Sequence, residues 1–95
     1  MQFHRQLDYP TEFEQEVATN VFAKSGHPTY RLVGVDYDEQ ENFTTAFTLI
    51  RNVVNGKLTG GVHSIGVSKR RATDHYDPKK GHTYALVRAL KRVIE

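Results

Sequence analysis

The dipeptide Asn55-Gly56 lies between two long runs of β-favouring residues, and it constrains the fold more than any other feature of the chain. The preceding run reads FTTAFTLIRNVV, and the following run covers about residues 57–69. A two-residue type I′ turn needs positive φ at both central positions, which Asn and Gly tolerate better than other residues. The sequence therefore predicts an antiparallel β-hairpin in the middle of the chain.

Helical patterns flank this hairpin on both sides. Thr11 and Glu14 have the spacing of a capping box, and the apolar stripe that follows predicts a helix over about residues 12–24. Near the other end, Pro78 directly follows an aspartate, which is typical of an N-cap and a first helical position. A second helix is therefore expected over about residues 78–94, with the following residues packed on a sheet: Leu86, Ala89, Leu90 and Val93.

A change of period after the first helix predicts one more strand. From Thr29 the residues are rich in β-branched and aromatic types, with Tyr30, Leu32 and Gly34 alternating against Arg31, Val33 and Val35. The polar run DEQEN at residues 38–42 indicates a loop before the hairpin. The order is then α-β-β-β-α, an α+β fold. Its economical packing is a three-stranded antiparallel sheet with two helices on one face and the other face open to solvent. The strand aromatics Tyr30, Phe43 and Phe47 are expected against the helices, although they could instead stack bases on the open face.

The length of 95 residues suits a single domain over residues 1–95, in which residues 1–10 form an N-terminal arm and residues 11–95 the core. The first residues are expected to be loosely packed, or to pair with a sheet edge in a dimer. Three glycines in the third predicted strand, Gly60, Gly61 and Gly66, indicate a bulge or a close approach of another backbone segment there.

Cysteine is absent, which excludes disulfides and thiolate metal sites. The chain has no apolar run close to the roughly 18 residues that span a bilayer, and it does not start like a signal peptide, so we expect a cytoplasmic protein without membrane contact. The five histidines lack metal-ligand spacing, and the serines and glycines match no nucleophile or phosphate-loop motif. We therefore expect no metal, no cofactor and no enzymatic activity.

The net charge of +2 conceals a strong asymmetry between the two halves of the chain. Residues 1–50 carry three Lys or Arg and eight Asp or Glu, giving −5, whereas residues 51–95 carry ten and three, giving +7. A basic surface of this size attracts phosphate, and it could equally pair with the acidic half of another copy of the chain.

Four short segments together resemble the double-stranded RNA-binding domain: PTYRLV after the first helix, FT opening the second strand, GVSKR ending the third, and YALVRAL in the second helix. The C-terminal part is also similar to small bacterial and phage proteins, including an actinobacterial family likened to ribosome hibernation factors. The resemblance covers about Phe13 to Ile94. It implies a double-stranded RNA-binding-domain-like fold, RNA or the ribosome as partner, and the host cytoplasm as location if the protein is phage-encoded.

In that family a lysine cluster at the start of the second helix contacts RNA phosphates, and the resemblance carries this role to Lys69, Arg70, Arg71, Lys79 and Lys80. With Arg88 added, these residues form the predicted nucleic-acid-binding patch, at the junction of the third strand and the second helix. Arg88, Lys91 and Arg92 share an outward stripe with Tyr84, which solvation alone would explain.

Two departures from the family leave a second interpretation open. The predicted helix over residues 12–24 and the DEQEN loop are acidic where the family contacts RNA, and residues 72–78 split the basic cluster. The leading hypothesis is a non-catalytic RNA- or ribosome-binding module. The alternative is a protein-interaction module that inhibits or escorts a host protein, or that forms a homodimer.

Overall fold

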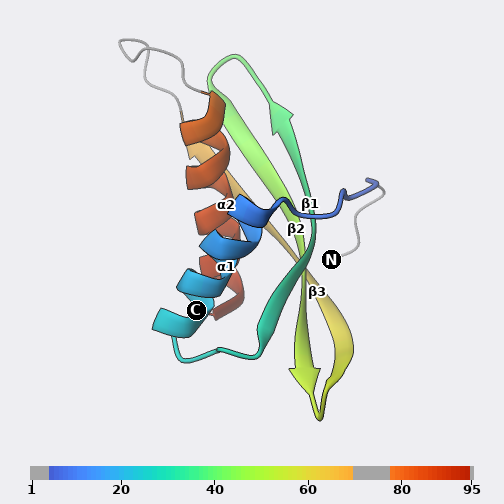
Figure 1. Ribbon diagram of the computed structural model, residues 1–95. Helices are drawn as coiled ribbons and strands as arrows, with labels where there is room; N and C mark the ends of the chain where they lie inside the picture. The colour runs from blue at the N-terminus through green and yellow to red at the C-terminus, as the bar shows by residue number, and fades with distance from the viewer. Residues whose placement is uncertain (1–4, 70–77, 95) are drawn as a thin grey trace.

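The computed structural model describes residues 5–69 and 78–94. Three strands form one antiparallel sheet with β2 in the centre, and both helices lie on the same face of it (Figure 1). The predicted α+β fold with the order α-β-β-β-α is confirmed. Within these residues, neither helix is long and apolar enough to cross a bilayer. The elements are α1 (Glu12–Lys24), β1 (Tyr30–Glu39), β2 (Phe43–Val54), β3 (Lys57–Lys69) and α2 (Pro78–Ile94).

The hairpin between β2 and β3 has the predicted turn. Asn55 and Gly56 both adopt positive φ, at 53° and 77°, as a type I′ turn requires. Further along β3 the pairing register skips Gly60, because Arg51 pairs with Gly61 while the next residue of β2 pairs with Thr59. The bulge expected from the strand glycines is therefore present.

The start of α1 is fixed by the predicted capping box. The Thr11 hydroxyl accepts a hydrogen bond from the Glu14 amide at 3.2 Å, and a Glu14 carboxylate oxygen accepts one from the Thr11 amide at 2.9 Å. Two amides that the helix itself leaves without a partner are satisfied in this way.

β1 departs from the simple alternation that its sequence suggested. A bulge at Val33 shifts the register, so that Leu32 and Val35 both face the helices and are 5% and 3% exposed. The strand also extends to Glu39, so the predicted loop at residues 38–42 is shorter than expected. The expectation of uniform alternation was wrong because a bulge depends on the partner strand.

α2 packs unusually close to β3 at Gly66. A Cβ atom at this position would lie 2.2 Å from the Ala85 carbonyl oxygen and 2.3 Å from the Ala89 amide nitrogen, so only glycine fits. Nearby, the Ser64 hydroxyl donates to the Ala89 carbonyl at 2.8 Å. As predicted, Leu86, Ala89 and Leu90 are buried, and Val93 packs against the core cluster that contains Leu86 and Leu90. This contact sets the position of α2 over the sheet.

The N-terminal arm is not loose over the described residues. Asp8 and Val35 exchange backbone hydrogen bonds of 2.9 and 3.0 Å, so the arm pairs with the β1 edge of its own chain (Figure 1). On the sheet face away from the helices, Leu7 packs where a side chain on Gly34 would otherwise lie. The expectations of a loosely packed terminus and of a fully open sheet face are wrong for this region, because the Leu7 side chain packs on the sheet over Gly34.

The strand aromatics divide between the two faces of the sheet. Tyr30 packs as expected with the helices, edge-on to Phe22 at a centroid distance of 5.5 Å. Phe43 and Phe47 instead point away from the helices: Phe43 is 41% exposed, and the Arg5 guanidinium lies 4.3 Å from the Phe47 ring centroid. The prediction of core positions for these two was wrong, because strand alternation assigns the helix-facing positions of β2 to Thr44, Ala46, Thr48 and Ile50.

Candidate nucleic-acid interface

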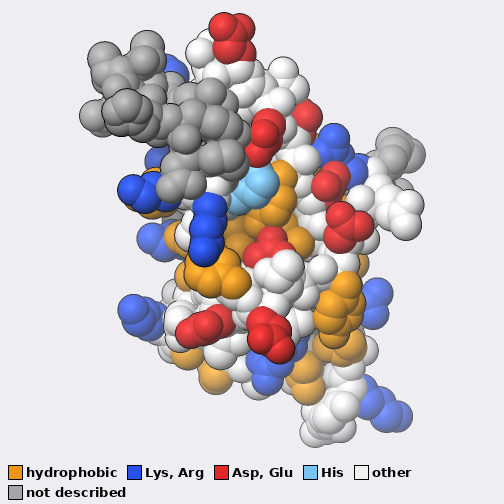
Figure 2. Space-filling view, turned by 45° about the horizontal axis from the view of Figure 1, so that its top comes forward, with side chains coloured by type: hydrophobic (Ala, Val, Ile, Leu, Met, Phe, Trp, Pro, Cys, Tyr) orange, Lys and Arg blue, Asp and Glu red, His pale blue; other side chains and the backbone are white. Residues whose placement is uncertain are grey.

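The charge asymmetry along the sequence becomes a separation in space. The eight Asp and Glu residues of the first half lie on the arm, α1, β1 and the turn that follows β1. The described residues of the second half, 51–69 and 78–94, carry eight Lys or Arg and no Asp or Glu. Figure 2 shows several Lys and Arg side chains along the margin on the α2 side and others at the opposite margin and the lower end, whereas Asp and Glu side chains are spread across the surface between them.

One row of exposed side chains follows the solvent face of α2. Lys80, Tyr84 and Arg88 are spaced by four residues and therefore share a helix face. Lys91 and Arg92 continue the row in the last turn. We call these five residues the basic ridge; at ~1.5 Å per residue it is about 18 Å long. Among the described residues, no carboxylate forms an ion pair with any of its cations.

The C-terminal part of the basic ridge borders a groove between α2 and β3. The groove has a volume of about 270 Å³ and is lined by Gly66, Val67, Arg88, Lys91 and Arg92. Arg88 donates a hydrogen bond to the Val67 carbonyl at 2.5 Å, which holds its guanidinium at the groove wall. A guanidinium has five N–H donors, so this bond leaves others for an anion.

The structure divides the predicted patch among several surfaces. Lys80 and Arg88 come together on the basic ridge. Lys79 turns toward α1, where its ammonium lies 5.2 Å from the Phe13 ring centroid. Lys69 lies opposite Phe43 on the neighbouring strand, and both side chains are on the sheet face away from the helices. Arg70 and Arg71 lie outside the described residues.

Sequence reasoning left Tyr84, Lys91 and Arg92 out of the site. Their helical spacing with Arg88 was recognised, but an outward stripe of charged residues is explained by solvation alone. The missing signal was the complete absence of carboxylates from residues 78–94. An exposed helix face stabilised by its own charges would carry both signs at i, i+4 spacing.

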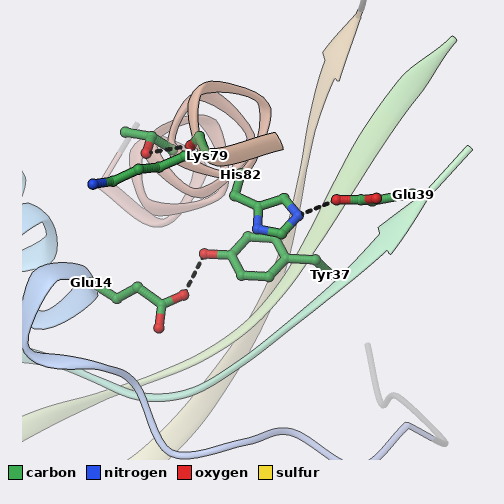
Figure 3. Close-up of polar contacts among 6 residues, drawn as sticks. Glu14, Tyr37, Glu39, Lys79 and His82 are labelled. Atoms are coloured by element: carbon green, nitrogen blue, oxygen red, sulfur yellow. Dashed lines mark hydrogen bonds and ion pairs between the residues drawn. The ribbon is translucent and has the colours of Figure 1, made fainter. Parts of the chain in front are cut away.

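A second group of polar side chains joins α1, β1 and α2 (Figure 3). The Tyr37 hydroxyl donates to Glu14 at 2.5 Å, and the His82 ring stacks on the Tyr37 ring with centroids 4.1 Å apart and planes 5° apart. His82 Nε2 in turn lies 2.5 Å from a Glu39 carboxylate oxygen. Sequence reasoning did not find this group, because its members come from three separate elements.

This polar group is explained by the fold itself. Burial, reinforced by the hydrogen bond to Glu14 and by its charge, raises the pKa of Tyr37 far above its ordinary value, so the phenol remains a donor. A cleft of about 450 Å³ opens beside the group, lined in part by Phe13, Lys79 and Leu86. The carboxylates of Glu14 and Glu39 are already hydrogen-bonded, and the described residues contain no cluster of three metal-ligating side chains. The group therefore ties the two helices to β1.

Comparison of the chain with protein-family models, with curated proteins and with solved structures gives no match. What the chain binds must therefore be inferred from the chemistry of its surface.

Proposed function

We propose that the protein is a non-catalytic RNA-binding module whose basic ridge and adjoining β3 groove contact the phosphate backbone. One observation carries the proposal: the basic ridge presents four Lys or Arg, and the described residues of α2 include no carboxylate. Such a row of cations concentrates a polyanion at the surface, and its binding is favoured by the release of condensed counterions.

Helix stability accounts for only part of this row. Lys91 and Arg92 lie in the last turn, where each cation interacts favourably with the helix dipole by about 0.3–1 kcal/mol. Lys80 lies near the positive end of the helix, where a cation is unfavourable by a similar amount. A cation that weakens its own helix and has no described carboxylate partner is better explained by a ligand.

The resemblance to double-stranded RNA-binding domains and to hibernation-factor-like proteins supports RNA over DNA, with ribosomal RNA as one natural source and the cytoplasm as the location. Phosphate contacts position a protein on its ligand without reading the sequence. Binding is therefore expected to depend on salt and to be largely indifferent to base sequence.

Fluorescence anisotropy with a labelled RNA oligonucleotide, between about 50 mM and about 200 mM salt, tests the proposal. The double variant Lys80→Ala/Lys91→Ala should weaken binding by about tenfold and lower the salt slope by about 1.4, since each lost contact on a single strand removes about 0.7. Circular dichroism checks that the variant is folded.

The matched control is Lys24→Ala/Lys57→Ala, which changes the net charge equally but away from the basic ridge. It should keep most of the affinity. Equal losses in the two double variants, or no binding at low salt, would contradict the proposal. Recovery of one protein from nuclease-treated cells would instead favour the protein-interaction alternative, for which the acidic surface is the supporting observation.

A further inference from the structure

We infer that the basic ridge takes single-stranded RNA, with an unpaired base stacked on Tyr84 between phosphates held by Lys80 and Arg88. This inference rests on the proposed function and adds the class of RNA that the surface can accept.

Tyr84 lies outside the core contact of α2. Its side chain is 58% exposed, whereas Ala85 and Leu86 directly after it are 0% and 1% exposed and form the core contact of α2. No described residue forms a hydrogen bond or a ring contact with it. More than half of this large aromatic side chain therefore remains in water, where its apolar surface gains nothing from burial.

The neighbours of Tyr84 on the helix surface are cations. Lys80 precedes it and Arg88 follows it by four residues, a spacing that places Cβ atoms about 5–6 Å apart on the same face. An aromatic ring between two cations matches the two requirements of a flexible single strand, which offers π faces and phosphates in alternation. The groove beside Arg88, Lys91 and Arg92 extends the cationic path for the next phosphates.

Duplex RNA would leave Tyr84 without a partner. In an A-form duplex the bases are stacked on one another, and the deep major groove is too narrow for side chains to read. A ring on a convex helix can meet a base face only where that base is unpaired.

The surfaces expected to grip a duplex are also unsuitable. Lys79, at the start of α2, is exposed, but its ammonium lies 5.2 Å from the Phe13 ring centroid, on the side of the acidic helix α1. Glu12 and Glu16 are exposed on α1, where they would repel a second line of phosphates.

The test compares an unstructured RNA oligonucleotide with the same sequence annealed into a duplex, at one low salt concentration. The wild-type chain should bind the single strand about tenfold or more tightly than the duplex. Tyr84→Ala should weaken single-strand binding by about 5- to 160-fold, which corresponds to ~1–3 kcal/mol of stacking, and leave duplex binding unchanged. Tyr84→Phe keeps the ring and should stay within about twofold of the wild type.

Phe43→Ala is the matched control, because it removes another exposed aromatic side chain, 41% exposed, from the sheet face away from α2. It should leave the affinity unchanged. If Tyr84→Ala binds like the wild type, or if the duplex binds more tightly, base stacking is overturned. If base stacking is overturned but Lys80→Ala/Lys91→Ala still weakens RNA binding, the proposed phosphate contact by the basic ridge is retained without the stacking. Absence of binding to either RNA would overturn both proposals.

Discussion

The two sides of this molecule use their charged residues in different ways. On the α1 and β1 side, carboxylates hold the fold together: Glu14 caps α1 and accepts from Tyr37, and Asp36 pairs with Arg5 at 3.2 Å. On the α2 and β3 side, Lys80 and Lys91 are exposed and form no ion pair within the described chain.

This difference separates charges that the fold explains from charges that it does not. A carboxylate that accepts hydrogen bonds from two elements contributes to stability, and removing it would be felt throughout the fold. An exposed lysine without a partner contributes little to stability. The surface whose charges the fold leaves unexplained is therefore the one expected to meet a ligand.

The largest effect is expected from detaching the basic side from the sheet. Gly66→Ala places a methyl group against the α2 backbone at Ala85 and Ala89, so it should destabilise the protein by about 3 kcal/mol and weaken RNA binding as α2 shifts. Urea denaturation measures the change. Gly60→Ala is the control, because apart from its chain neighbours no atom lies within 4 Å of the added methyl group. A similar loss of stability there would contradict the packing account.

A smaller loss of stability is expected from a substitution on the α1 and β1 side. Tyr37→Phe removes the hydrogen bond to Glu14, and bonds to charged groups contribute about 1.5–3 kcal/mol, so stability should fall by roughly 2 kcal/mol. RNA affinity at low temperature should stay within about twofold of the wild type, since the basic ridge is untouched. A large loss of affinity in a folded Tyr37→Phe protein would show that the two sides are not independent.

The same side chain predicts a dependence on alkaline pH. Burial raises the pKa of Tyr37 in the fold, so above the ordinary tyrosine pKa of about 10 the unfolded chain loses this proton while the folded chain keeps it. Stability from this group is thus present below about pH 10 and declines as pH rises further. Denaturation curves of wild type and Tyr37→Phe, measured across that range, should converge; parallel curves would contradict the assignment.

The smallest effect is expected from the exposed carboxylates of α1. Glu12→Gln/Glu16→Gln changes solvated side chains, so stability should move by only about 0.5 kcal/mol. RNA affinity should rise slightly, because two charges that repel phosphates are removed. A marked loss of RNA binding in this variant would show that the interface lies on the α1 side instead of the α2 side.

Local signals made much of the fold predictable. The Asn55-Gly56 turn, the capping box at Thr11 and the apolar period of α2 each depend on a few neighbouring residues, and each is found where the sequence placed it. The bulge at Val33 and the outward positions of Phe43 and Phe47 were missed, because they depend on register with a partner strand.

The candidate site was less predictable for a related reason. Lys79 and Lys80 are adjacent in sequence and both exposed, yet the packing of α2 against α1 places the first beside Phe13 and leaves the second on the basic ridge. The contact among Tyr37, Glu39 and His82 joins residues more than forty positions apart, which no local pattern reveals.

Backbone amide NMR during titration with a single-stranded RNA oligonucleotide tests the central claim most directly. The account predicts that the amide signals of residues 80–92, together with Gly66 and Val67, shift on binding, while those of α1 stay in place. Shifts concentrated on α1 and β1, with α2 unchanged, would contradict it.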